Sequence, residues 1–446
     1  MKRKPRVHII HVGSVQNKGT YALLRSEISE IRKTCENNVE ISVSTDDVET
    51  LENLEPNLKV YPGLIDIPFS RTDIALRRGR RRRTFLSYGV WIMRHTCLMM
   101  LQAFLATASA LSMSIGVKPR YRTETLLRIR ECDLVISTAD ESFKEGSVYM
   151  RLNVYWMLNW WTILFSRMAE ILIVKRLLAK PLIVFPNSIG PFQTRVGLLL
   201  ARIIFANVDL VMLREVHSYG LFKKLDVKTP SMLTTDVALL FRCPGSKVGR
   251  SLPPRAVGVC PALYALSFSV DEVRGYIASH AAVLDYLVGE CKHNVVFLPH
   301  EVSPVKPQDD LQISRAIVGE MKHANNTRII ETSSVDEFKS CLSQLDFLIT
   351  SRMHPAVLAC AANVPTLMLV YDHKQTGFFA QLGLTDYMLP VRDITRDTLL
   401  KKVSLLLGNM DKVKTELRLR VPVLQDDLRT SIRKAMVYAN QSVMQS

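Results

Sequence analysis

The sequence predicts an α/β protein built from two Rossmann-like domains, and three observations support this fold class. The chain has 446 residues, which is too long for one ordinary hydrophobic core. Short apolar runs rich in β-branched residues alternate with longer helical patterns, as in parallel sheets of α/β units. Residues 242–255 are rich in Gly, Pro and basic residues without an apolar period, which is typical of a linker. We therefore expect domains at residues 1–245 and 252–446.

Ten segments are expected to form strands, five on each side of the linker. They are residues 6–13, 39–45, 133–138, 181–187, 208–213, 256–260, 294–300, 327–332, 346–351 and 365–371. Residues 65–125 form a basic and apolar insert in the first domain. The region from Arg396 to Ser446 is amphipathic and mostly helical, with one break expected near Pro422. We expect it to brace back against the first domain.

The charge balance favours an anionic partner. The chain has 58 Lys and Arg against 42 Asp and Glu, a net charge of +16, which attracts phosphorylated donors, anionic lipids or nucleic acid. No nucleic acid is expected, because the arginines of residues 77–83 lack interleaved aromatic residues and no zinc-finger or RNA-recognition signature is present. The eight cysteines include no C-x-x-C pair, so no metal site is expected. Scattered free cysteines are typical of a reducing compartment, which we therefore expect.

One segment has the character of a membrane helix. Residues 96–117 carry no formal charge and are long enough to span a bilayer. A single crossing is disfavoured, because strands 6–13 and 133–138 are expected in one sheet that the membrane would divide. Two alternatives stay open: a core helix, or a helix in the interface with the arginines of residues 77–83 at lipid headgroups. The basic N-terminus reads as a strand and not as a signal peptide. We expect a cytoplasmic protein, or one peripheral at the inner face of the membrane.

Three candidate binding segments follow strands in the first domain. Glycine lets backbone N–H groups approach a ligand, a helix N-terminus favours an anion or hydroxyl, and an Arg at a strand end points into the crevice of an open sheet. Each segment also has a purely structural interpretation. In chain order these are a strand-to-helix turn, a tight turn and a surface ion pair. The candidate residues are Asn17, Gly19 and Thr20, then Ser188 and Gly190, then Arg214 with Glu215 and Ser218.

The strongest chemical pair is Arg352 and His354, at the end of one predicted strand and before an apolar helix. Arg offers a planar fork for phosphate or carboxylate, and His carries a proton that moves near neutral pH. The alternative is a His that caps the helix beside a surface Arg. His300 and Lys374 lie at equivalent strand ends in the second domain.

Taken in order, these motifs resemble the polysaccharide pyruvyl transferase family over residues 12 to about 385. The resemblance rests on Asn17-Lys-Gly19-Thr20, Ser188-Ile-Gly-Pro-Phe192, Arg214-Glu215 with Ser218, Thr235-Asp236-Val-Ala, Leu298-Pro-His300, Ser351-Arg352-x-His354 and Tyr371-x-x-Lys374. It implies a glycosyltransferase-B-like arrangement, phosphoenolpyruvate as donor, a sugar or lipid-linked glycan as acceptor, a ketal product, and no metal or other cofactor.

The resemblance also implies roles for individual residues. His354 is expected to be the general acid, and Arg352 and Arg214 are expected to hold the phosphate and carboxylate of the donor. The expected substrate-binding residues are Asn17, Gly19, Thr20, Ser188, Gly190, Glu141, His300 and Lys374.

The loop at residues 139–145 departs from the family pattern, which is usually acidic and rich in glycine. Here it reads Ala-Asp-Glu-Ser-Phe-Lys-Glu, so side chains stand where bare backbone is usual. Two other functions therefore remain as alternatives: a nucleotide-sugar-dependent glycosyltransferase, and a catalytically retired member of the family that binds glycans or anions.

Overall fold

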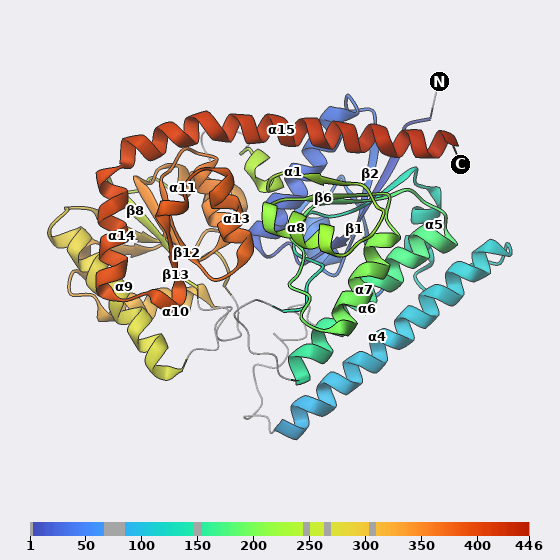
Figure 1. Cartoon of the computed structure of the whole chain (residues 1–446), viewed down its shortest axis with the longest axis horizontal. Coiled ribbons are helices and arrows are strands. Elements are labelled where there is room, and N and C mark those ends of the chain that lie inside the picture. The colour runs from blue at the N-terminus through green and yellow to red at the C-terminus, as the bar shows by residue number, and fades with distance from the viewer. Residues whose placement is uncertain are drawn as a thin grey trace.

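The computed structural model describes residues 3–66, 85–146, 154–243, 250–262, 269–302 and 309–445. Within these ranges the chain forms two parallel sheets flanked by helices, with a long C-terminal helix along one side of both (Figure 1). The arginines of residues 77–83 and the centre of the expected linker, residues 244–249, lie outside the described residues. The domain boundaries at 245 and 252 therefore stay a prediction.

The first sheet has seven parallel strands in the order β3-β2-β1-β4-β5-β6-β7. They are β1 (Arg6–Val12), β2 (Glu40–Thr45), β3 (Lys59–Pro62), β4 (Leu134–Ser137), β5 (Leu182–Asn187), β6 (Leu210–Leu213) and β7 (Ser231–Leu233). The order reverses between β1 and β4. The carboxyl ends of two such neighbouring strands diverge into loops on opposite faces, which opens a crevice where ligands bind in open α/β sheets.

The second sheet has six parallel strands in the order β10-β9-β8-β11-β12-β13. They are β8 (Ala256–Cys260), β9 (Asn294–Phe297), β10 (Thr327–Ile329), β11 (Phe347–Thr350), β12 (Thr366–Val370) and β13 (Met388–Pro390). Here the order reverses between β8 and β11, so the segment after β11 lies at the second crevice.

Helices connect the strands and cover both faces of each sheet. In the first domain they are α1 (Lys18–Thr34), α2 (Val48–Leu54), α4 (Phe85–Ser114), α5 (Thr123–Glu131), α6 (Val154–Leu172), α7 (Arg195–Ala206) and α8 (Val216–Lys224). In the second they are α9 (Val270–Gly289), α10 (Asp310–Glu320), α11 (Val335–Ser343), α12 (Met353–Cys360), α13 (His373–Gln381), α14 (Arg396–Gly408) and α15 (Met410–Gln445). Short π or 3-10 turns are η1 (Ile173–Leu177), η2 (Val237–Leu240), η3 (Ala324–Asn326), η4 (Thr385–Tyr387) and η5 (Val391–Asp393).

All ten strands expected from the sequence are present, and three more, β3, β7 and β13, were missed. Each of the three lies at an edge of its sheet. An edge strand is covered by a neighbour on one side only, so it needs no continuous apolar run. The segments Lys59–Pro62, Ser231–Leu233 and Met388–Pro390 are short and half-exposed, which explains why periodicity did not reveal them.

Helix α15 connects the two domains. It contacts α1 and η2 of the first domain, where Nε2 of Gln425 donates to the Leu239 carbonyl at 2.7 Å. Apolar side chains of α15 belong to a core that is continuous across both sheets. The break expected near Pro422 is wrong, because the helix runs through this residue. Pro422 and Arg418 are both exposed, so water can bond the Arg418 carbonyl that loses its N–H partner.

Candidate functional site

The two domains meet where α1 and α12 begin. Helix α1 starts after Asn17, whose side-chain oxygen accepts from the Gly19 N–H at 2.9 Å. His354 lies in the first turn of α12, directly after the switch-point strand β11. A Cβ atom on Gly19 would lie 2.1 Å from Nδ1 of His354. Only a glycine therefore lets the imidazole of one domain lie against the helix N-terminus of the other. Thr20 is half-buried on the same turn.

The imidazole of His354 lies among charged groups from both domains. Burial lowers its pKa below the ordinary 6.5, and the cations Arg214 and Lys374 lower it further, while the carboxylates Asp236 and Asp140 oppose the shift. The Nε2 atom is buried and has no hydrogen-bond partner among the described residues. The neutral ring therefore presents one nitrogen that a ligand can engage.

Arg214 follows β6 and is almost wholly buried. Its Nη1 lies 2.8 Å from Oδ2 of Asp236, and its Nε donates to Oγ of Ser188 at 2.7 Å. Burial disfavours the charge, but Asp236 together with Asp140, Glu141 and Glu215 outweighs this and raises the pKa of the guanidinium. Arg214 is a permanent cation whose position is fixed by two partners, so the alternative of an exposed surface pair does not apply.

The loop after β4 connects the turn at Gly190 to the second domain. The Gly190 N–H donates to the Phe143 carbonyl at 2.8 Å, and its φ of +69° is a conformation that favours glycine. From the same loop, Glu141 binds Lys374 at the start of α13, and Nζ of Lys144 lies 2.9 Å from its other oxygen. Burial opposes ionisation of Glu141, but Lys144 and Lys374 hold its pKa well below the usual range.

Arg352 faces two carboxylates of its own domain. Its Nη2 lies 2.6 Å from Oδ1 of Asp310, and its Nη1 lies 3.0 Å from Oε2 of Glu301. Burial opposes the charge, but Asp310 and Glu301 outweigh it and raise the pKa of Arg352. From the sequence we expected the Arg352 guanidinium to be available to a donor. In the structure its charge is already balanced by carboxylates of the second domain. His300 lies nearby, with its ring centre 6.3 Å from that of His354.

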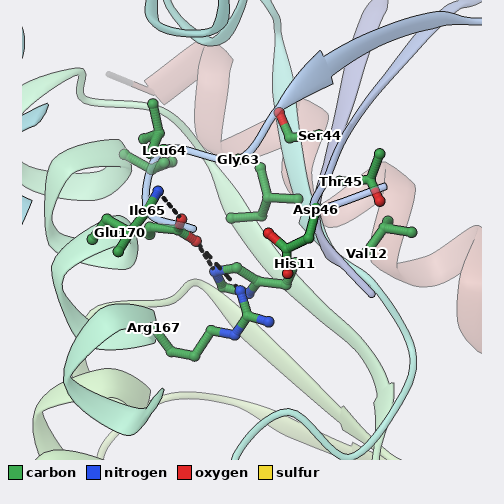
Figure 2. A pocket seen from close by; sticks show the side chains of 12 residues that line it. His11, Val12, Ser44, Thr45, Asp46, Gly63, Leu64, Ile65, Arg167 and Glu170 are labelled. Carbon is green, nitrogen blue, oxygen red and sulfur yellow. Dashed lines mark hydrogen bonds and ion pairs between the residues drawn. The ribbon is translucent and has the colours of Figure 1, made fainter. Parts of the chain in front are cut away.

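A second polar cluster surrounds a small cavity at the carboxyl ends of β1 and β2 (Figure 2). His11 Nε2 lies 2.8 Å from Glu170 Oε2, and Nη1 of Arg167 lies 3.6 Å from the same oxygen. Burial, and then Arg167, lowers the pKa of His11 to about 4, so its ring is neutral. Burial raises the pKa of Asp46 to about 7. The cavity has room for about one water molecule.

The sequence did not reveal several of these groups. Asp236 was part of a motif without an assigned role, and His11, Asp46, Arg167, Glu170 and Asp310 gave no signal beyond their residue type. Glu27 of α1 was also missed: it accepts from Ala139 N, and Thr138 Oγ1 lies 3.0 Å from its Oε2. Burial raises the pKa of Glu27 to about 8, although the Ala139 N–H and the Thr138 hydroxyl donate to its carboxyl group and oppose the shift. Glu27 could have been identified from the sequence as a polar residue on the inward face of a predicted helix.

Comparisons with known proteins agree with this arrangement. A family model described as polysaccharide pyruvyl transferase matches residues 17–373. The amylovoran biosynthesis protein AmsJ of Erwinia amylovora is 22% identical over 270 residues, which cover 53% of this chain and 60% of that protein. The chain thus matches less than two thirds of the length of this relative.

Solved structures of low identity share the fold. A UDP-GlcNAc 2-epimerase from Neisseria meningitidis, bound to UDP-GlcNAc, has a TM-score of 0.55 and 9% identity over 97% of this chain and 99% of the other. The glycotransferase of kitacinnamycin has a TM-score of 0.52 and 10% identity over 98% and 100%. These likenesses concern the fold alone. They confirm two Rossmann-like domains in a glycosyltransferase-B-like arrangement.

Proposed function

The chain belongs to the polysaccharide pyruvyl transferase family, and we propose that it transfers a pyruvyl group from phosphoenolpyruvate to a sugar, forming a cyclic ketal. The observation that carries this proposal is the position of His354. Its Nε2 is buried without a partner among the described residues, and Arg214 and Lys374 lie close enough to affect its titration. A proton donor beside fixed cations suits an anionic donor whose carbon must be protonated.

The proposed reaction has two stages. His354 gives its proton to the methylene carbon of phosphoenolpyruvate, and a sugar hydroxyl adds to the neighbouring carbon, which still carries the phosphate. A second hydroxyl then displaces the phosphate from that carbon and closes the ketal. Two hydroxyl protons leave in total; one replaces the proton that His354 gave, and the other leaves with the phosphate. The product is a pyruvate ketal and inorganic phosphate.

The lowered pKa of His354 fits this role when the donor is counted. Burial and the neighbouring cations favour the neutral ring in the free protein. A phosphate and a carboxylate beside the ring favour its charged form and raise the pKa again. Donor binding is then coupled to proton uptake, so the acid is charged when the donor is present.

The cations of the site divide into two groups in this proposal. Arg214 and Lys374 lie around His354, each paired with one carboxylate, Asp236 and Glu141 respectively, and are proposed to hold the anionic groups of the donor. Arg352 is bound to Asp310 and Glu301, so it contacts the donor only if one carboxylate is displaced; its first role is to fix the turn that carries His354. No resident cofactor or metal ion takes part in the proposed scheme.

The acceptor is proposed to be a sugar of a polysaccharide or of a lipid-linked glycan precursor. Asn17, Thr20, Ser188, Gly190 and His300 are the residues that we propose to bind its hydroxyls. The loop at residues 139–145 has side chains where the family usually has glycine, so the loop is expected to select the acceptor.

Mass spectrometry after incubation with phosphoenolpyruvate and glycan precursors tests the proposal. We expect a glycan that gains one pyruvate ketal, with one phosphate released for each ketal. Titration calorimetry with phosphoenolpyruvate and with nucleotide sugars separates the alternatives. Binding of a nucleotide sugar alone contradicts the proposal and favours a glycosyltransferase. Donor binding without turnover on any precursor favours a retired, anion-binding protein.

A further inference from the structure

Helix α4 presents its large apolar side chains to the outside of the molecule. It lies along the first domain beside α6, on the side away from α15 (Figure 1). The face toward α6 buries mainly small residues, namely Ala103, Ala106 and Ala110 with Met99 and Met113. The exposed face carries Met93, Leu98, Met100, Leu101, Phe104, Leu105 and Leu111, followed by Ile115 and Val117. Phe104 is 69% exposed and Leu101 is 52% exposed.

This distribution is the reverse of a surface helix in a soluble protein, which turns its large apolar residues inward. Isolated exposed apolar residues are ordinary, but a continuous stripe along several turns marks a contact surface. Met93–Ser114 is also long and apolar enough to cross a membrane, and only 33% of an 18-residue apolar window within it is buried. The face therefore needs a partner that accepts a long, uninterrupted apolar strip.

Charges at the ends of this face indicate which partner. Arg94 lies on its first turns, and Lys118 and Arg120 follow its last turn; all three are exposed. The sequence from residue 74 to residue 123 contains ten Lys and Arg and no Asp or Glu. A second copy of the chain, packed face to face, would bring these like charges together. An anionic lipid surface complements both the charges and the apolar strip.

We propose that the exposed face of α4 docks on an anionic phospholipid bilayer, with the helix lying in the plane of the interface. The strands β3 and β4 precede and follow α4 and belong to one sheet. A transmembrane crossing would divide that sheet, so the contact is peripheral. The proposal does not rest on the transferase activity, and it would hold the crevice near membrane-bound acceptors.

Vesicle flotation of the full chain tests the proposal. We expect binding to phosphatidylcholine vesicles that contain phosphatidylglycerol and little binding to pure phosphatidylcholine, with release at high salt. Leu101→Ser with Phe104→Ser should lower the partition constant at least tenfold. Leu199→Ser with Leu419→Ser is the matched control, because these leucines are similarly exposed, 58% and 63%, on α7 and α15. The control should bind as the parent does.

A charge variant separates lipid attraction from general stickiness. Lys118→Gln with Arg120→Gln should weaken binding to anionic vesicles about 25-fold, at roughly fivefold for each basic residue near the surface. Lys412→Gln with Arg418→Gln on α15 is the charge-matched control and should have no effect. Thermal melts of all variants should match the parent, since every substituted side chain is exposed.

Four results would overturn the proposal. One is absence of vesicle binding by the parent chain, and another is equal binding by the α4 and control variants. Retention after carbonate washing would show an integral segment. A parent dimer that Leu101→Ser with Phe104→Ser converts to monomer, measured by analytical ultracentrifugation without lipid, would assign the face to a second copy of the chain.

Discussion

Gly19 and His354 come from different domains and lie so close that a Cβ on Gly19 would stand 2.1 Å from Nδ1 of His354. The contact places an imidazole from the start of α12 against the N-terminal turn of α1. It depends on a missing side chain, so its importance can be measured by adding one methyl group.

Gly19→Ala should lower turnover about a hundredfold, because the methyl group pushes the proposed acid out of position or separates the domains. Steady-state kinetics and a thermal melt measure the two effects separately. Gly220→Ala is the matched control: this helical glycine has nothing within 4 Å of an added Cβ. Normal turnover in a folded Gly19→Ala protein would show that this contact plays no part in catalysis.

Arg214→Lys should weaken phosphoenolpyruvate binding although the charge is kept. Lys cannot reproduce the fork that bonds Asp236 and Ser188, so the cation moves within the site. Calorimetric titration should show at least a tenfold loss of affinity, since a charge-assisted bond contributes about 1.5–3 kcal/mol. Arg202→Lys, at an exposed position on α7, is the control. Unchanged affinity in the Arg214 variant would place the donor elsewhere.

Arg352→Ala should destabilise the fold by about 3–5 kcal/mol, because it leaves Asp310 and Glu301 buried without their cation. Denaturant unfolding measures this loss. Adding Asp310→Asn should restore part of the stability, since it removes one of the uncompensated carboxylates. A stable Arg352→Ala protein with weakened donor binding would instead assign Arg352 a direct contact with the donor.

Glu27 should make stability depend on pH. Burial raises its pKa from 4.5 to about 8, so the folded chain holds a proton that the unfolded chain releases between these values. The contribution of this group to the free energy of unfolding therefore falls as pH rises from about 4.5 to about 8. Glu27→Gln keeps a neutral, hydrogen-bonding group at this position. The melting temperature of the variant should therefore rise relative to that of the parent as the pH increases across this range. Glu52→Gln, at an exposed position, should show no such trend; a parallel trend in both would contradict the assignment.

The sequence predicted the two parallel sheets because their central strands are continuous apolar runs, such as Phe347–Thr350 of β11. It also placed Gly19, Arg214, His354 and Lys374 correctly at the carboxyl ends of strands, where motifs and topology agree. It did not predict which charges pair. Asp310 and Arg352 are 42 residues apart, and their contact depends on where the tertiary fold places the first turn of α10 relative to the end of β11.

The same limit explains the missed strands and the missed polar cluster. An edge strand such as Lys59–Pro62 has only one neighbour and no distinctive apolar pattern. His11 and Glu170 meet only because α6 folds over the end of β1, which no local pattern records. The exposed face of α4 was not predicted either, because a uniformly apolar helix does not reveal which side is covered.

Kinetics of His354→Gln, combined with donor titration, test whether His354 protonates the donor. Gln keeps the polarity and the approximate size of the side chain but cannot deliver a proton. We expect a folded protein that still binds phosphoenolpyruvate, with an affinity lowered only by the loss of the charged imidazole, and with turnover lowered about a hundredfold or more. Full turnover in a folded His354→Gln protein would contradict the claim that His354 protonates the donor.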